Sequence, residues 1–246
     1  MQKEKDIETT KNVSSNEDIS MDKANNAFDT IKEYRMKNVN KVILANLNIN
    51  SIPNKFSSLK ELVSNNIDVL VIQETKLDET FPEKSFMIPG FKAPFRQDRN
   101  RHGGGIMVFV REDIPSRMLP TINGFEDFEG LFIEINLRKS KWLLLATYKP
   151  PSLSKEFYFS RVNKALDAFG SNFENIILME DLNTTDTDET LIEFLEDREF
   201  SNLVHFPTCF ISEENPSTID LIITNKQAFK TRQAFQQDSQ TSIRWF

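Results

Sequence analysis

Residues 176–183, Ile-Ile-Leu-Met-Glu-Asp-Leu-Asn, change abruptly from apolar to polar. A short apolar run of this kind predicts a buried β-strand, with an acid and an amide delivered to its end. Two earlier runs have the same design: residues 42–44 lead to Asn46, Asn48 and Asn50, and residues 69–72 lead to Gln73 and Glu74. Each acid could simply cap its strand and face water. Because a buried carboxylate without a partner is costly, three such strand ends together favour a shared hard-metal site.

Strand and helix patterns alternate from Lys41 onward. Short apolar or β-branched runs predict strands at residues 41–48, 68–74, 105–111, 130–137, 141–148, 175–181 and 218–224. Helical spacing of apolar residues predicts helices around Phe56, Leu59 and Leu62, around Phe159, Val162, Leu166 and Phe169, and around Leu191, Phe194 and Leu195. Asn54 or Ser57 could cap the first helix, and Ser152 or Ser154 the second. The mixture favours stacked sheets covered by helices over one parallel sheet.

Composition bounds the rest of the chain. A length of 246 residues with 39% apolar content is enough to bury one substantial core. Cys209 is the only cysteine, which excludes an internal disulfide and suits a reducing compartment. No apolar run is long enough to span a bilayer, so we expect a soluble intracellular protein, nuclear or cytoplasmic. Residues 1–40 are polar and predicted to be mostly disordered, although the spacing of apolar residues at 27–34 allows a short docked helix.

Charge argues against bulk attraction to nucleic acid. The net charge is −7 and the pI is about 5.1, the wrong sign for such binding. Any DNA contact must therefore be local. Residues 92–117 are the best candidate segment, because six cations outnumber three acids there: Lys92, Arg96, Arg99, Arg101, Arg111 and Arg117 against Asp98, Glu112 and Asp113. For each arginine taken singly, the alternative is a solvated loop residue.

A series of short motifs follows in a fixed order: Leu47-Asn48-Ile49-Asn50, Gln73-Glu74-Thr75-Lys76-Leu77, Gly103-Gly104-Gly105, Thr147-Tyr148, Asp181-Leu182-Asn183, Thr208-Cys209-Phe210 and Thr218-Ile219-Asp220. From about Lys41 to about Asn225, this series resembles the endonuclease/exonuclease/phosphatase superfamily. More narrowly, it is similar to the endonuclease domain of LINE-type (non-LTR) retrotransposon polymerase proteins. The resemblance implies an α+β fold, a four-layered α/β/β/α sandwich. It also implies DNA phosphodiester hydrolysis with Mg²⁺, or Mn²⁺ in its place, by a monomer that acts on DNA and contacts no membrane.

Phosphodiester hydrolysis needs a water in line, a group that takes its proton, and positive charge on the phosphate oxygens. Glu74 would be the principal carboxylate ligand of the metal, and the resemblance makes Asn48 the residue that steadies Glu74 or the metal. Asp181 would orient and activate the water. Asn183 would donate its amide to the phosphate; the alternative is an Asx turn that begins the loop to the next helix, which could coexist with this role. The hydroxyl of Tyr148 could hold a phosphate oxygen, or the ring could simply pack at the surface.

The resemblance assigns roles to further residues. It implies that Asp220 orients a catalytic histidine. Arg99, Arg101 and Thr208 are the expected substrate-binding residues.

Two departures from the family pattern point to impaired activity. No Ser-Asp-His tripeptide follows Asn225, so the domain is predicted to span residues 41–229 without its last strand, followed by a divergent tail at residues 230–246. His102 and His205, the only histidines, do not match the missing position; a solvated loop residue and a packing residue are expected instead. Glu180 stands where the family usually has glycine. Beside Asp181 it should repel phosphate or raise the pKa of Asp181, or it could bind the metal itself.

Three functions therefore stay open from the sequence. The first is an impaired Mg²⁺-dependent DNA endonuclease of retrotransposon origin. The second is an inactive module that binds nucleic acid or a protein through the same cleft. The third, less consistent with the glycine run and with Thr208, is a lipid or inositol-phosphate phosphoesterase.

Overall fold

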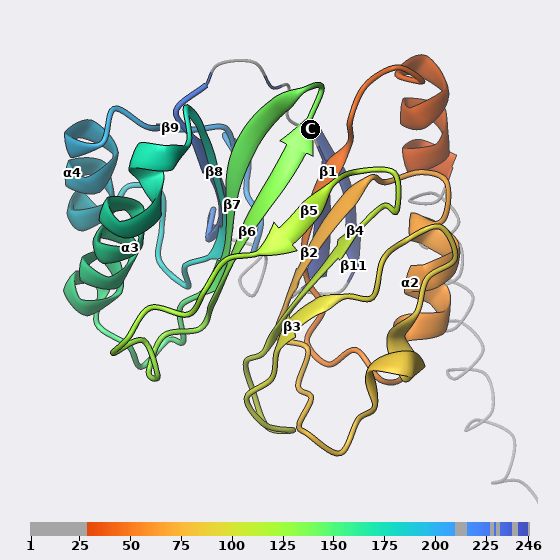
Figure 1. The fold of residues 1–246 in the computed structure, drawn as a ribbon, viewed down its shortest axis with the longest axis horizontal. Coiled ribbons are helices and arrows are strands. Elements are labelled where there is room, and N and C mark those ends of the chain that lie inside the picture. Colours follow the sequence, from red (N-terminus) through yellow and green to blue (C-terminus); the bar gives the residue numbers. More distant parts are fainter. Residues whose placement is uncertain (1–28, 210–215, 227–228, 230–231, 238–240, 246) are drawn as a thin grey trace, which may run out of the picture.

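Two six-stranded β-sheets lie face to face, and helices cover the outer side of each (Figure 1). The computed structural model describes residues 29–209, 216–226, 229, 232–237 and 241–245. Three apolar cores separate the layers: one between the sheets, one between the first sheet and its helices, and one between the second sheet and its helices. The predicted four-layered α/β/β/α sandwich is confirmed.

Sheet 1 has the strand order β11-β12-β1-β2-β4-β3. Its strands are β1 (Leu44–Asn48), β2 (Val69–Gln73), β3 (Phe95–Gln97), β4 (Ile106–Val110), β11 (Arg232–Gln237) and β12 (Thr241–Trp245). Strands β1 and β2 run parallel, and every other pair is antiparallel. The carboxyl ends of β1 and β2 therefore meet at one edge of the sheet.

Sheet 2 repeats this plan with the strand order β5-β6-β7-β8-β10-β9. Its strands are β5 (Ser116–Met118), β6 (Gly130–Leu137), β7 (Ser140–Tyr148), β8 (Asn175–Asp181), β9 (Ser201–Asn202) and β10 (Asp220–Thr224). Strands β7 and β8 form its parallel pair. All the strands predicted from apolar runs are present within a few residues. Strands β3, β5 and β9 were not predicted, because runs of two or three residues carry no periodic signal.

Helix α2 (Phe56–Val63) and the 3₁₀ helix η1 (Glu83–Phe86) pack on sheet 1; α3 (Lys155–Phe169), η2 (Gly170–Asn172) and α4 (Glu189–Asp197) cover sheet 2. The side chain of Ser154 accepts a hydrogen bond from the backbone N–H of Phe157, so the predicted cap of α3 is confirmed. Helix α2 instead begins after Lys55 without a side-chain cap, so the predicted caps Asn54 and Ser57 are wrong.

The ordered part of the chain begins before residue 41. Residues 29–37 form a helix, which bears out the alternative of a docked helix; residues 1–28 lie outside the described residues. Ile31 of this helix is buried against sheet 1. Arg35 forms an ion pair with Asp68 at 2.6 Å and donates to the carbonyl of Asn66. The helix is therefore fixed by both apolar contact and a largely buried ion pair. None of the described helices has the length and apolar character needed to cross a bilayer.

The tail completes sheet 1. Strand β12 pairs antiparallel with β1, with Ile243 opposite Leu47, and β11 pairs with β12. The expectation that the last strand is missing is therefore wrong: β1 has a neighbour on each side. Neither strand was predicted from the sequence, because the tail is largely polar and backbone pairing in a sheet does not require an apolar run.

An interior proline in β12 should destabilise the protein. Ile243 of β12 pairs with Leu47 of β1 on one side and with Phe235 of β11 on the other, so its backbone lies inside the sheet. We expect Ile243→Pro to remove one ladder bond and lower the free energy of unfolding by about 1–3 kcal/mol. Ile243→Val is the matched control, and urea unfolding followed by circular dichroism measures both. Equal stability of the two variants would show that β12 contributes nothing to sheet 1.

Candidate active site at the carboxyl ends of the central strands

Four polar side chains from four strands meet at one edge of the two sheets. Asn48 ends β1, Glu74 directly follows β2, Tyr148 ends β7 and Asp181 ends β8. These strands are the two parallel pairs, with Asn48 in register with Gln73 and Tyr148 in register with Asp181. The sequence prediction that polar strand ends converge holds for these residues.

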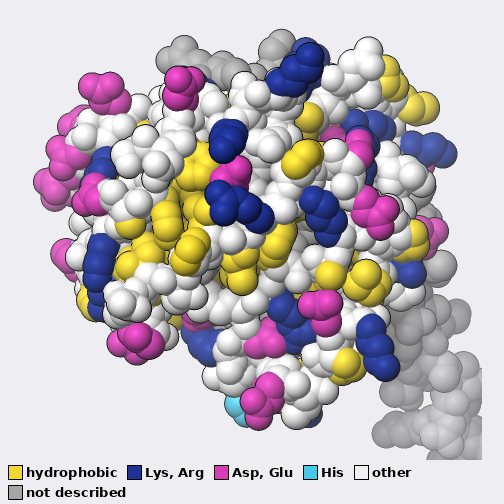
Figure 2. Space-filling view, viewed as in Figure 1, with side chains coloured by type: hydrophobic (Ala, Val, Ile, Leu, Met, Phe, Trp, Pro, Cys, Tyr) yellow, Lys and Arg dark blue, Asp and Glu magenta, His cyan; other side chains and the backbone are white. Residues whose placement is uncertain are grey.

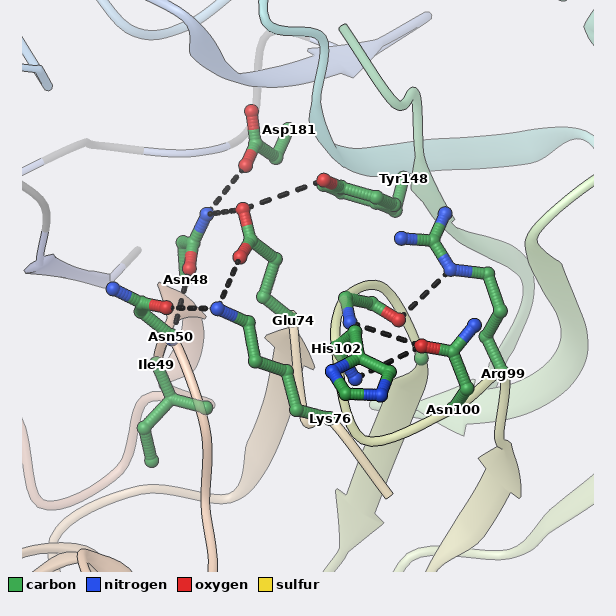
Figure 3. A network of polar contacts seen from close by, with 12 residues as sticks. Asn48, Ile49, Asn50, Glu74, Lys76, Arg99, Asn100, His102, Tyr148 and Asp181 are labelled. Atoms are coloured by element: carbon green, nitrogen blue, oxygen red, sulfur yellow. Dashed lines mark hydrogen bonds and ion pairs between the residues drawn. The ribbon is translucent and has the colours of Figure 1, made fainter. Parts of the chain in front are cut away.

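A hydrogen-bond network joins the four side chains, as Figure 3 shows. The amide Nδ2 of Asn48 donates to Asp181 Oδ2 at 2.6 Å and to Glu74 Oε1 at 3.1 Å. The Tyr148 hydroxyl donates to the same Glu74 oxygen at 3.3 Å. Asn48 Oδ1 accepts from the backbone N–H of Asn50, which fixes the amide in this orientation. Asn48 therefore steadies both carboxylates through its nitrogen; direct contact with a metal stays a prediction.

Lys76 adds a positive charge that sequence reasoning did not assign. Its Nζ lies 3.5 Å from Glu74 Oε2 and donates to Asn50 Oδ1. No periodic pattern marks this lysine; only its place two residues after Glu74 could have suggested it. Both side chains are about one-fifth exposed. The carboxylate can therefore leave the ammonium to bind a cation, and the ammonium can leave the carboxylate to bind a phosphate.

The backbone around the network is strained. Glu74 and Lys76 each have φ of 53°, and Asn50 and Asn183 have 45° and 47°. A residue with a side chain in this left-handed region costs of the order of 1–3 kcal/mol and persists only where the surroundings hold it. Here the carbonyl of Glu74 accepts from the N–H of Ser51 at 2.8 Å. Such strain collects at sites where a side chain must be aimed, which supports a functional role for this edge.

Asp181 is fully buried, and its environment favours the protonated carboxyl. Burial, then the nearby carboxyl of Asp220, raise the pKa of Asp181 well above its usual value, although hydrogen bonds from Asn48 and Asn183 oppose the change. Asp220 starts β10 directly opposite Asp181 in the antiparallel ladder. Such a carboxyl is a stronger base once it is ionised, but it can accept a proton only in that ionised form. The two acids therefore lie side by side, which the sequence did not predict, and the role of Asp220 in orienting a histidine stays a prediction.

Tyr148 and Asn183 complete the surroundings of Asp181. Burial, Glu74 and Asp181 raise the pKa of the Tyr148 phenol, so the hydroxyl stays protonated and donates. The backbone N–H of Asn183 donates to Asp181 Oδ1 at 3.1 Å, which is the expected Asx turn. The Asn183 amide donates to the carbonyl of Lys149 at 3.0 Å. A contact of that amide with phosphate stays a prediction.

The three expected substrate-binding residues already have partners inside the protein. Thr208 is buried, and its Oγ1 accepts from the backbone N–H groups of Ile219 and Asp220, where it holds the start of β10. Arg101 pairs with Asp78 at 2.6 Å. Arg99 pairs with a carboxylate and lies over the Tyr148 ring, 5.7 Å from its centre. Their contact with a substrate stays a prediction.

Every arginine of the basic segment 92–117 is ion-paired. The pairs are Arg96 with Asp98, Arg99 with Glu129, Arg101 with Asp78, Arg111 with Asp68 and Asp113, and Arg117 with Glu134. On the face shown in Figure 2, lysine and arginine side chains are scattered among acidic and apolar ones, and acidic side chains gather over α4 at the left. The excess of basic residues in the sequence segment is therefore not an excess of free cations at the surface.

Glu180 faces away from the site. Side chains alternate along β8, so Met179 lies in the core between the sheets while Leu178 lies against the helices. Glu180 shares the helix side: it accepts from the hydroxyl of Tyr158 on α3 and from Thr147 at 3.5 Å. The expectation that it repels phosphate or binds the metal is wrong, because the sheet separates its carboxyl from that of Asp181.

Neither histidine belongs to the network. His102 is exposed, as expected for a solvated loop residue, and its backbone N–H donates to Asn100 Oδ1. His205 is also exposed, so its predicted packing role is wrong; Val204 beside it is the buried residue.

The donor set suits a weakly held, hydrated cation. Within the described ranges, no three His, Cys, Asp or Glu side chains are grouped so that they could hold a metal ion. Mg²⁺ keeps most of its waters and often takes one or two carboxylates, so the partly exposed carboxylate of Glu74 fits this role. Asp181 is a poorer ligand because burial favours its protonated form.

Comparison with known proteins identifies the fold. No protein-family model and no curated protein matches the chain. Solved structures do. The 3' phosphatase NExo from Neisseria, bound to a product DNA hairpin, has a TM-score of 0.65 at 16% identity and covers 83% of this chain and 98% of its own. The endonuclease domain of TRAS1, a telomere-specific non-LTR retrotransposon, has 0.61 at 16%, with 83% and 97% covered. An AP endonuclease from Archaeoglobus fulgidus has 0.61 at 13%, with 84% and 99% covered.

At these identities the likeness establishes architecture alone. The chain has the fold shared by the nucleases and phosphatases of the endonuclease/exonuclease/phosphatase superfamily.

Glu180 should make the protein less stable as the pH rises. Burial raises its pKa to about 7, from an ordinary value of 4.5, despite hydrogen bonds from Tyr158 and Thr147. The folded state therefore holds a proton that the unfolded state has lost. The free energy of unfolding should fall as the pH rises from 4.5 through 7, by about 3 kcal/mol from this group.

Glu180→Gln carries no proton to lose and should show a flatter pH dependence in urea unfolding at pH 5 and pH 8. Glu193→Gln, on the exposed side of α4, is the matched control. If wild type and Glu180→Gln lose the same stability between these two pH values, Glu180 is not the group responsible.

Proposed function

We propose that the chain is a metal-dependent phosphodiesterase that cleaves DNA, derived from a retrotransposon endonuclease and working at a reduced rate. The observation that carries the proposal is the single network that joins Asn48 and Glu74 of sheet 1 to Tyr148 and Asp181 of sheet 2. The order of motifs along the sequence, and the fold shared with the TRAS1 endonuclease domain, support this descent.

Each chemical requirement of phosphodiester hydrolysis has a residue in the network. Glu74, steadied by Asn48, would hold Mg²⁺ or Mn²⁺, which when bound offsets charge on the phosphate oxygens. Asp181, held in place by the amide of Asn48, accepts the proton of the attacking water when its carboxyl is ionised. The protonated hydroxyl of Tyr148 donates to a phosphate oxygen. Lys76, beside Glu74, supplies a further positive charge for that oxygen.

The reduced rate follows from the residues at the start of β12. Because β12 runs antiparallel to β1, its first residues lie toward the Asn48 end of β1. The resemblance places a metal-site acid and a catalytic histidine in a Ser-Asp-His tripeptide just before the last strand, and no such tripeptide follows Asn225 in this chain. Loss of one general acid–base group typically lowers a rate by about 10²–10⁴-fold.

Binding of DNA without cleavage is the second candidate function. It is favoured by the positions of His102 and His205, the two histidines of the chain, which are both exposed and lie outside the network. The two functions share the same network of side chains and differ in turnover. A nicking assay therefore separates them.

Slow nicking of supercoiled plasmid in Mg²⁺ is the expected result for the wild-type chain. Asp181→Asn should bring nicking to background, because the amide cannot accept the water proton, and Glu74→Gln should do the same by weakening the metal site. Asp113→Asn, on an exposed side chain, is the matched control. Absence of nicking by wild type, together with retained DNA binding, would replace this function with the second one.

Mg²⁺ should bind with a dissociation constant in the millimolar range, because one partly exposed carboxylate and an adjacent ammonium form a weak site. Removing the ammonium in Lys76→Met should tighten binding by roughly fivefold, the equivalent of about 1 kcal/mol between charges 4 Å apart in water. Isothermal titration calorimetry measures both constants, and Glu74→Gln should abolish the signal. Micromolar affinity that persists in Glu74→Gln would place the ion elsewhere.

A further inference from the structure

We propose that Glu129 is a positioning residue that aims Tyr148 and fixes the Glu74 segment against it. The proposal rests on the phosphodiesterase function proposed above. Glu129 precedes β6 in a loop, and its side chain is only 12% exposed, although the neighbouring Glu126 and Asp127 are exposed. A carboxylate withdrawn from water in a surface loop needs partners. Each hydrogen-bond partner of its carboxylate connects it to a residue of the candidate active site.

One carboxylate oxygen of Glu129 controls the Tyr148 ring through Arg99. Glu129 Oε1 accepts from Arg99 NH1 at 2.5 Å, and Arg99 Nε donates to the carbonyl of Gly103 at 2.8 Å. Two fixed contacts hold the guanidinium plane, which lies over the Tyr148 ring. The backbone N–H of Tyr148 also donates to the carbonyl of Glu129 at 3.2 Å. Glu129 therefore holds both the backbone and, through Arg99, the ring of Tyr148.

The other carboxylate oxygen holds the segment that carries Glu74. Glu129 Oε2 accepts from the backbone N–H of Gly105 at 2.7 Å. The carbonyls of Gly104 and Gly105 in turn accept from the N–H groups of Lys76 and Thr75, at 3.0 and 3.2 Å. These bonds clamp the strained backbone next to Glu74, where φ is left-handed at Glu74 and Lys76. One carboxylate thus fixes the donor hydroxyl and its acceptor relative to each other.

The glycine run is shaped for this clamp. At Gly104, φ is +68°, and a Cβ there would come within 2.4 Å of both the Arg99 guanidinium and Glu129 Oε2. At Gly103 a Cβ would lie 2.5 Å from Arg99 NH2. Gly103 and Gly104 therefore make room for the ion pair, whereas at Gly105, where φ is +87°, a Cβ would lie 2.4 Å from Thr75 Oγ1. Arg99 is accordingly a part of the clamp, not a free cation awaiting a phosphate.

Steady-state nicking kinetics test the catalytic consequence. Glu129→Gln keeps an oxygen for Gly105 but weakens the hold on Arg99, and Arg99→Met removes the guanidinium. We expect each to lower kcat by roughly ten- to hundredfold with little change in KM, and the double variant to be no worse than the worse single one. Glu134→Gln, which breaks a similar Glu–Arg pair on β6 away from the site, should leave kcat unchanged. A raised KM with unchanged kcat in Arg99→Met would show direct substrate binding and overturn the proposal.

A measurement on the protein without substrate tests the clamp itself. The chain has three tyrosines, so ring-labelled tyrosine gives few NMR resonances, and Tyr148→Phe identifies the one from Tyr148. Glu129→Gln and Arg99→Met should shift that resonance and leave those of Tyr34 and Tyr158 in place. An unmoved Tyr148 resonance overturns the proposal even in an active enzyme. Should Glu129→Gln fail to fold, Arg99→Lys carries the same test, and an inactive wild type removes the proposed function while the NMR result still decides the clamp.

Discussion

The side-chain amide of Asn48 ties the two halves of the site together. One nitrogen donates to Glu74, which directly follows β2 of sheet 1, and to Asp181, which ends β8 of sheet 2. Without this amide, two carboxylates at the junction of the sheets would repel each other when ionised and each would lose one donor, and burial strengthens both effects. The amide removes part of that cost without adding charge. The orientation of the sheets at this edge is thus coupled to the chemistry of the site.

Contacts from neighbouring segments hold the strained backbone and the polar side chains at this edge in place. The left-handed residues Glu74 and Lys76 are held by backbone bonds from residues 51–52 on one side and 104–105 on the other. Beneath them, Gln73 donates to Asn46 at 2.8 Å inside the core between the sheets. Gln73 also donates to the carbonyl of Met179 at 3.4 Å, so this buried polar pair links the two sheets beneath the site.

The sequence predicted the strands correctly where their burial produces a recognisable run of apolar residues. Apolar runs located the central strands and hence the convergence of Asn48, Glu74 and Asp181, because parallel neighbours share an edge. The alternation of side chains along β8 would also have placed Glu180 on the other face of sheet 2 from Asp181. The comparison with a glycine of the family drew attention away from this alternation. Other features had no local signal. Arg99 and its partner Glu129 are 30 residues apart, so the basic segment looked free, and the polar tail gave no indication of β11 and β12.

The network that defines the site joins residues separated by 133 positions along the chain, since Asn48 bonds to Asp181. Contacts of such long range form late in folding, because the loop they close must first lose its conformational entropy. Either sheet alone lacks half of the donors and acceptors. A nascent or partly unfolded chain therefore has no assembled site. The edge can therefore bind or act on a ligand through this network only after both sheets have docked.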